Sequence, residues 1–81
     1  MKLSPFQIVL IVLTAAIAQQ DIQIAKRLIP QLTLLRQKAN QRYAELTELL
    51  INTNEAILEH EWEAATVHLE RARQHLNQGR Y

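Results

Sequence analysis

Three histidines, His60, His68 and His75, are the residues best suited to metal or acid–base chemistry in this chain of 81 residues. Their spacings of eight and seven residues separate neighbours by roughly 10 to 12 Å along a helix, too far for two of them to share one metal ion. The sequence also lacks the H-x-x-x-H and E-x-x-H pairs that build zinc and di-iron sites on helices, and it has no cysteine. We therefore predict neither a metal site nor any other cofactor.

Catalytic and nucleic-acid-binding patterns are also missing from the sequence. Glu59 and Glu63 lie one helical turn apart, but acid–base catalysis by such a pair needs a cleft that shifts the pKa of a carboxyl group, and two helices provide none. The single glycine, Gly79, excludes a glycine-rich phosphate loop and a G-x-S-x-G turn. A formal net charge of +1 provides no global field for DNA or RNA. We expect a protein that is not an enzyme and that binds no nucleic acid and no small-molecule substrate.

The most distinctive element of the sequence is an apolar segment near the N-terminus, which is the first candidate for a binding surface. Residues 3 to 20 carry no charge, and as a helix they rise about 27 Å, close to the ~30 Å hydrocarbon core of a bilayer. We predict a helix over residues 5 to 29 that acts as a membrane anchor. A signal peptide cleaved after Ala18 and a helix buried by a partner are the alternatives. The residues predicted to contact the bilayer or a partner helix are Ile8, Val9, Leu10, Ile11, Val12, Leu13 and Ile17.

Basic residues follow this segment and predict its orientation. The positive-inside rule places the C-terminal part in the cytoplasm, with the basic side chains beside anionic head groups. A cytoplasmic complex and export are the alternative locations. The basic juxtamembrane residues are Lys26, Arg27, Arg36 and Lys38.

The rest of the chain has a helical period. From Leu28 onward apolar residues recur at alternating steps of four and three, and strong helix formers dominate. Pro30 is expected to end or kink the first helix near Ile29, and it can serve as the opening residue of the next helix. We predict an all-α fold, in which an apolar N-terminal helix, residues 1 to 29, precedes a coiled-coil-like antiparallel hairpin of two helices, residues 30 to 81. The helix-seam residues are Leu32, Leu35, Leu46, Leu49, Trp62, Leu69 and Leu76.

Several positions compete for the turn of this hairpin. Asn52-Thr53-Asn54 is the main cluster of turn-forming residues, with Asn52 as the cap of a last helix that stops at Gly79. The rival turn is His60-Glu61. In a third geometry a continuous helix over residues 31 to 77 pairs with a second copy, setting basic residues 26 to 42 against acidic residues 45 to 63.

The spacing of Trp62, Ala65, Leu69 and Ala72 resembles the second helix of a tetratricopeptide repeat, over about a third of the chain. Asn52 and Thr53 depart from the residues that the first helix of that repeat requires, and no second copy is present. Such repeats need roughly three copies for stability. The peptide-binding role of the family is therefore not carried over.

We predict a small non-catalytic interaction protein, a single-pass membrane-anchored accessory, scaffold or assembly factor of a larger complex. The alternatives are a soluble adaptor or secretion-type chaperone subunit obligately paired with a partner, and an exported helical protein of 63 residues. A protein partner or a homo-oligomer is expected, because the narrow downstream stripe should not cover a helix that is apolar on every side.

Overall fold

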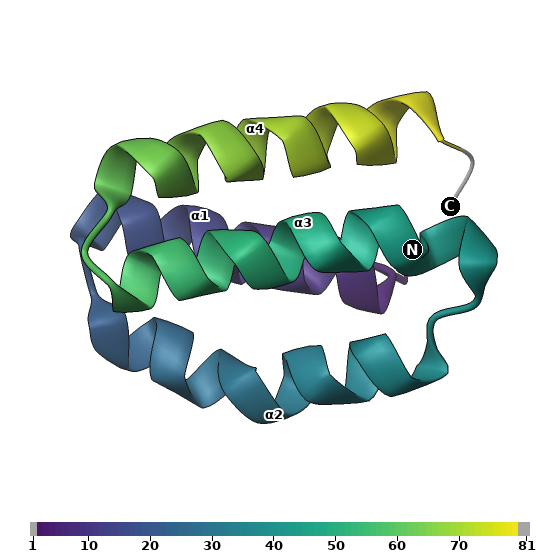
Figure 1. Cartoon of the computed structure of the whole chain (residues 1–81), viewed down its shortest axis with the longest axis horizontal. Coiled ribbons are helices and arrows are strands. Elements are labelled where there is room, and N and C mark those ends of the chain that lie inside the picture. Colours follow the sequence, from purple (N-terminus) through teal and green to yellow (C-terminus); the bar gives the residue numbers. More distant parts are fainter. Residues whose placement is uncertain (1, 80–81) are drawn as a thin grey trace.

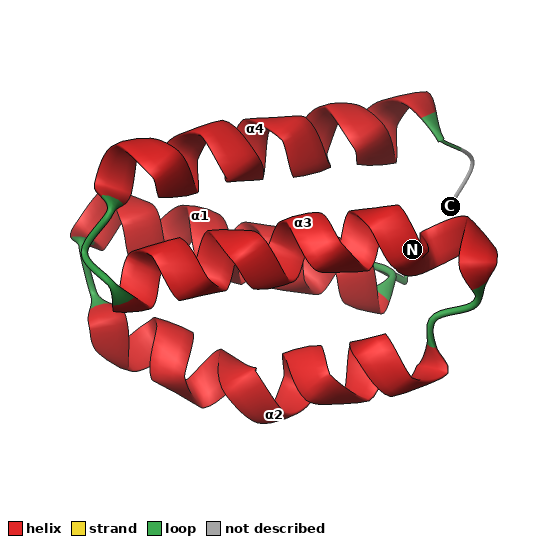
Figure 2. Cartoon of the chain, viewed as in Figure 1, coloured by secondary structure: helices red, strands yellow, loops and turns green. Residues whose placement is uncertain are grey.

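The computed structural model describes residues 2 to 79, which form four α-helices connected by short turns (Figures 1 and 2). The helices are α1 (Pro5–Gln19), α2 (Ile22–Lys38), α3 (Gln41–Leu58) and α4 (Trp62–Gln78). Successive helices run in opposite directions, within overall dimensions of 30 × 25 × 23 Å (Figure 1). The all-α class is confirmed. The predicted hairpin of two helices is wrong, because three helices follow the first one.

α1 begins with a complete capping box. The Ser4 Oγ accepts a hydrogen bond from the Gln7 backbone N–H at 3.2 Å, and the Gln7 Oε1 accepts one from the Ser4 N–H at 2.7 Å. Pro5 occupies the first turn, where its missing N–H removes no helical hydrogen bond. These contacts satisfy donors that a helix start leaves free, and they set the start of α1 independently of tertiary packing.

The predicted helix over residues 5 to 29 is in fact two helices. Gln20 adopts a left-handed conformation, with φ of 49°, and the Asp21 N–H donates back to the Ala16 carbonyl at 2.9 Å. Asp21 then caps α2 through the Gln23 N–H. The polar Gln-Asp step thus ends one helix and starts the next. Among the described residues no helix is long and apolar enough to cross a membrane.

The prediction that Pro30 ends a helix is also wrong, because Pro30 lies inside α2. A proline in a helix leaves the carbonyl four residues earlier without its donor, here that of Lys26. Lys26 and Pro30 are both exposed and lie on the same side of the helix, so water can reach that carbonyl. The cost of the missing hydrogen bond is therefore reduced, and the helix continues to Lys38.

The turns of the C-terminal half lie at residues 39 to 40 and 59 to 61, and the first of them was not predicted. Asn40 accepts hydrogen bonds on Oδ1 from the N–H groups of Arg42 and Tyr43 and caps α3. His60 takes a left-handed conformation, with φ of 60°, between α3 and α4. The rival turn at His60-Glu61 is confirmed, as is Gly79 directly after the last helix.

The turn predicted at Asn52-Thr53-Asn54 is wrong, because all three residues lie inside α3. The Thr53 hydroxyl donates a hydrogen bond to the Leu49 carbonyl one turn earlier, at 2.7 Å. The Asn54 Nδ2 donates a hydrogen bond to the Ala25 carbonyl on α2. Tertiary contacts therefore override the local turn preference of these side chains. The continuous helix over residues 31 to 77 is wrong as well, since it breaks at both C-terminal turns.

α1 and α3 form the centre of the bundle. Each contacts the three other helices, whereas α2 and α4 have no contact with each other among the described residues. Val9, Leu13 and Ala16 form the buried stripe of α1. The expectation that downstream residues leave α1 uncovered is therefore wrong for this inner side, where Leu13 is fully buried. The core also contains Ala25, Leu28, Leu32, Leu46, Leu50, Ile51, Ala56, Ile57, Ala65, Leu69 and Ala72.

Candidate interaction groove

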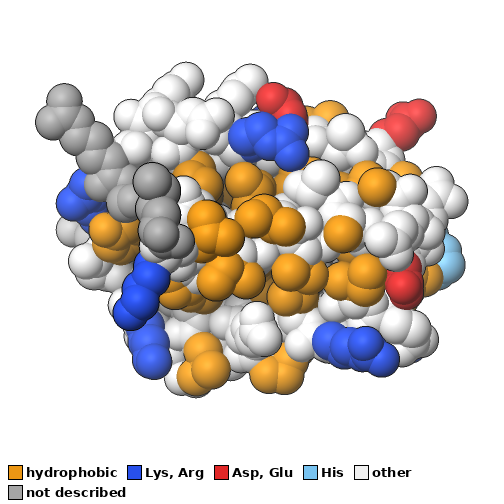
Figure 3. All heavy atoms as spheres, turned by 180° about the vertical axis from the view of Figure 1, so that it is seen from behind, with side chains coloured by type: hydrophobic (Ala, Val, Ile, Leu, Met, Phe, Trp, Pro, Cys, Tyr) orange, Lys and Arg blue, Asp and Glu red, His pale blue; other side chains and the backbone are white. Residues whose placement is uncertain are grey.

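The outer side of α1 remains open to solvent although it is apolar. Ile8 and Ile11 are 45% and 55% exposed, and Leu34 on the neighbouring α2 is 51% exposed. Figure 3 shows the face of the bundle that carries α1, with hydrophobic side chains in a band across it. α1 packs against the three other helices, and within residues 2 to 79 no helix covers its remaining side, which is apolar as well.

Two adjoining hollows run along the boundary between α1 and α2. The hollow nearer the N-terminus of α1 has a volume of about 280 Å³, and the other has a volume of about 440 Å³. Ile8 and Gln31 line both of them, so the hollows are neighbours, and we refer to the two together as the groove. Its walls come from both helices, and Val12 and Ala15 belong to the α1 wall. The α2 wall includes Ile24, Leu28, Leu34 and Leu35.

Charge on the groove is of one sign. Arg27 lines the larger hollow and Lys38 the smaller one, and no Asp or Glu lines either hollow within residues 2 to 79. Both side chains are exposed. The groove is therefore an open, mainly apolar depression that runs from Ile24 to Lys38 along α2, with one cation in each half.

The predicted N-terminal contact residues divide between the core and this groove. Val9 and Leu13 are buried in the core, and Leu10, Val12 and Ile17 are partly buried against it. Ile8 and Ile11 are the exposed members. Helical geometry accounts for the division, because α1 turns a different side toward each neighbour.

The predicted seam residues all lie in the core or pack against it, and Leu35 also lines the groove. Leu32, Leu46 and Leu69 are buried. The others, partly buried and packed against the core, are Leu35, Leu49, Trp62 and Leu76. They come from three helices rather than the two arms of a hairpin, so the stripes meet around α1 and α3.

The four predicted basic residues have different surroundings on α2. Arg36 forms a bidentate ion pair with Glu48 of α3, with nitrogen–oxygen distances of 2.9 to 3.2 Å. Arg27 and Lys38 line the groove, and Lys26 is exposed outside it. One ion pair, Arg36 with Glu48, therefore joins the basic segment to the acidic segment within one chain. The homodimer hypothesis, in contrast, set the basic segment of one copy against the acidic segment of a second copy.

The predicted histidines do not converge. His75 lies beside Glu45 of α3, with Nε2 and Oε2 3.2 Å apart, and the His60 ring lies edge-on to that of Trp62. Within the described part of the chain no group of three His, Cys, Asp or Glu side chains could hold a metal ion.

The groove, with its exposed aliphatic side chains, is the candidate binding site of this chain. No family model, curated protein or solved structure matches this chain.

Sequence reasoning missed the α2 wall of the groove. The expectation that Pro30 ends a helix assigned Ile24 and Leu34 to different elements. As a single helix, residues 22 to 38 carry apolar residues at Ile24, Leu28 and Leu35, at steps of four and seven. That period predicts a helix with an apolar side, and it was the available signal for the groove.

Proposed function

We propose that this protein is a non-catalytic interaction module that binds an amphipathic helix of a partner protein in the groove between α1 and α2. The observation that carries this proposal is the row of half-exposed aliphatic side chains, Ile8, Ile11 and Leu34, along the edges of the groove. Large exposed apolar patches on a folded domain mark interaction sites. The membrane-anchored accessory factor proposed from the sequence belongs to the same class of non-catalytic binding proteins, but its apolar residues face a partner helix here.

The shape of the groove favours a helix. Grooves between the side-chain ridges of packed helices accept the ridges of another helix. The α2 wall runs from Ile24 to Lys38, so the groove is about 21 Å long, and a partner helix of about 15 residues spans it. Such a helix fills both hollows, whereas a lipid surface would rest on the exposed side chains at the edges.

Charge selects the chemistry of the partner. Arg27 and Lys38 attract Asp or Glu residues that flank the apolar side of the bound helix. A second copy bound through the same face would bring these cations toward their own counterparts, because a two-fold interface pairs a surface with itself. The bound helix is therefore acidic at its flanks and comes from another protein.

Photo-crosslinking tests the proposal in cells that express the full chain. The variant Ile11→p-benzoylphenylalanine places the reactive group in the groove, and Val67→p-benzoylphenylalanine is the control, because Val67 is 48% exposed but lies on α4. We expect a protein adduct at Ile11 alone, whose crosslinked peptide is an apolar helix flanked by Asp or Glu. Adducts to lipid, to a second copy of the chain, or equally at both positions would overturn the proposal.

Charge reversal tests the same interface with the crosslinked segment as a labelled peptide. Replacing both groove cations, Arg27→Glu with Lys38→Glu, should weaken binding by about tenfold in fluorescence anisotropy, and added salt should reduce the difference. Lys26→Glu with Arg71→Glu is the matched control, because both residues are exposed cations outside the groove and the pair changes the net charge by the same amount. Equal loss in the control would show that only net charge matters and would contradict the proposed rim contacts.

A further inference from the structure

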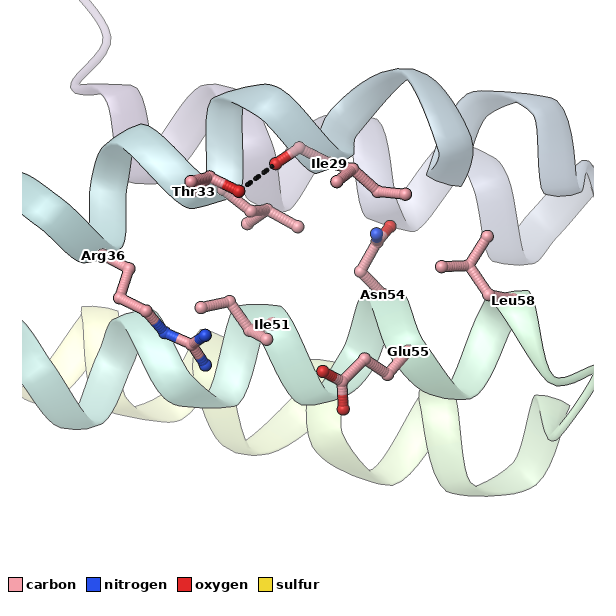
Figure 4. Close-up of a pocket in the computed structure, with 8 residues that line it drawn as sticks. Ile29, Thr33, Arg36, Ile51, Asn54, Glu55 and Leu58 are labelled. Carbon is pink, nitrogen blue, oxygen red and sulfur yellow. Dashed lines mark hydrogen bonds between the residues drawn. The ribbon is translucent and has the colours of Figure 1, made fainter.

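A second cavity lies between α2 and α3, on a different side of α2 from the groove. Its volume is about 300 Å³, and its aliphatic walls are Ile29 and Leu32 of α2 with Ile51 and Leu58 of α3. Figure 4 shows the Asn54 amide pointing from α3 toward α2, between Ile29 and Leu58. The cavity thus combines apolar walls with one buried amide.

The oxygen of that amide has no hydrogen-bond partner among residues 2 to 79. The Asn54 Nδ2 donates to the Ala25 carbonyl at 3.1 Å, which fixes which end of the amide is the donor. Its Oδ1 accepts no hydrogen bond, although the residue is only 2% exposed. Buried acceptors are nearly always paired, and one left alone destabilises the fold, so a donor from outside the chain would gain by reaching it.

The other polar side chains of the cavity narrow the class of ligand. Arg36 is held by Glu48, and the Thr33 hydroxyl donates to the Ile29 carbonyl at 2.9 Å. The buried group of the cavity that lacks a partner is an acceptor, the Asn54 oxygen, and the exposed carboxylate of Glu55 at the rim is a second acceptor. A ligand that reaches the Asn54 oxygen carries an N–H or O–H donor.

Size sets the other limit. A dry apolar cavity of roughly 150 Å³ holds benzene, so the 300 Å³ of this cavity accommodates one or two fused rings. The Asn54 oxygen has almost no accessible surface, so the ligand enters by a rearrangement of the wall. Ile29 is 46% exposed and has room to move.

We propose that the cavity between α2 and α3 is a small-ligand site, which takes a compact aromatic molecule whose N–H or O–H group donates to the Asn54 Oδ1. This site is separate from the groove, because it uses the α2 residues Ile29, Leu32, Thr33 and Arg36, none of which lines the groove. A failure of helix binding in the groove would therefore not affect the proposal of this ligand site.

A pair of probes tests the proposal on the unmodified full chain. Indole carries a ring N–H, and 1-methylindole is the same ring system without the donor. In a two-dimensional ¹H–¹⁵N NMR titration we expect indole to shift signals around the cavity saturably and to bind about tenfold more tightly than 1-methylindole, the difference that one hydrogen bond makes. Equal binding of the two, no saturable shift, or shifts confined to the α1–α2 groove would overturn it.

Two variants add independent tests. Asn54→Leu keeps the number and branching of the side-chain heavy atoms and removes the acceptor, together with the Nδ2 donor to Ala25, so indole should lose its preference over 1-methylindole. Thr33→Trp changes an exposed rim residue and should block the cavity, lowering the affinity for indole at least tenfold with unchanged helical circular dichroism. Retained donor preference in Asn54→Leu, or unchanged affinity in Thr33→Trp, would contradict the site.

Discussion

Asn54 on α3 donates a hydrogen bond from Nδ2 to the backbone carbonyl of Ala25 on α2, 3.1 Å away. Both residues are buried, so the bond lies in the interior of the bundle. Apolar contacts between two helices tolerate small axial shifts, whereas a buried directional bond does not. This pair therefore fixes the register of α2 against α3, and with it the positions of Arg27 and Lys38 along the groove.

The two sides of α1 should respond differently to truncation. Leu13→Ala removes a fully buried side chain at the centre of α1 and should lower the free energy of unfolding by about 3 kcal/mol. Ile11→Ala, on the exposed side, should lower it by less than about 1 kcal/mol. Urea unfolding followed by circular dichroism measures both. Similar losses for the two variants would show that the outer side of α1 is covered in solution.

The turn between α1 and α2 should be improved by glycine. Gln20 has a φ of 49°, and glycine reaches this left-handed conformation without the steric cost of a Cβ. Gln20→Gly should raise the free energy of unfolding by about 0.5 to 1 kcal/mol. Gln19→Gly is the matched control, since Gln19 is helical and the same change there should lower stability by about 1 kcal/mol. Thermal melts of both variants show whether each substitution raises or lowers the stability of the fold.

Chain connectivity predicts where insertions are tolerated. Three glycines inserted after Ala39 lengthen an existing turn and should change the free energy of unfolding by less than about 1 kcal/mol. The same insertion after Asn52 interrupts α3 and rotates its buried residues out of register, so it should unfold the bundle or lower the melting temperature strongly. A tolerated insertion after Asn52 would mean that the chain turns there.

Composition and periodicity were enough to predict helices, because alternating steps of three and four are specific to one backbone geometry. The end of the last helix at Gly79 followed from the same local rules. Asn40 also signals a helix start, but the polar cluster at residues 52 to 54 is longer and gives the stronger local turn signal. Which signal dominates is decided by tertiary contacts, such as the bond from Asn54 to Ala25.

The exposed part of the candidate groove could not be predicted from α1 alone. A helix that is apolar on every side does not reveal which side other helices will cover. Ile11 and Leu13 cannot be distinguished by the sequence pattern, yet Ile11 is 55% exposed and Leu13 is fully buried. Their difference depends on where α2, α3 and α4 pack, and that required the correct placement of Pro30 within a helix.

Replacing Pro30 tests the account of α2 directly. Alanine at this position restores an N–H that can donate to the Lys26 carbonyl, and it removes the clash of the proline ring with the preceding turn. Alanine also makes the unfolded chain more flexible than proline does. This increase in the entropy of the unfolded chain lowers the gain in stability by about 0.4 to 1 kcal/mol. Pro30→Ala should therefore raise the free energy of unfolding by about 1 to 2 kcal/mol.

Gln31→Ala is the control for this change, because it alters a neighbouring exposed residue of α2 without supplying a backbone donor. It should leave the free energy of unfolding within about 0.5 kcal/mol of the original. Amide hydrogen exchange gives a second readout, since the new backbone N–H that Pro30→Ala introduces should be protected if it joins the helix. Loss of stability in Pro30→Ala would instead show that the proline ring itself supports the packing of α2.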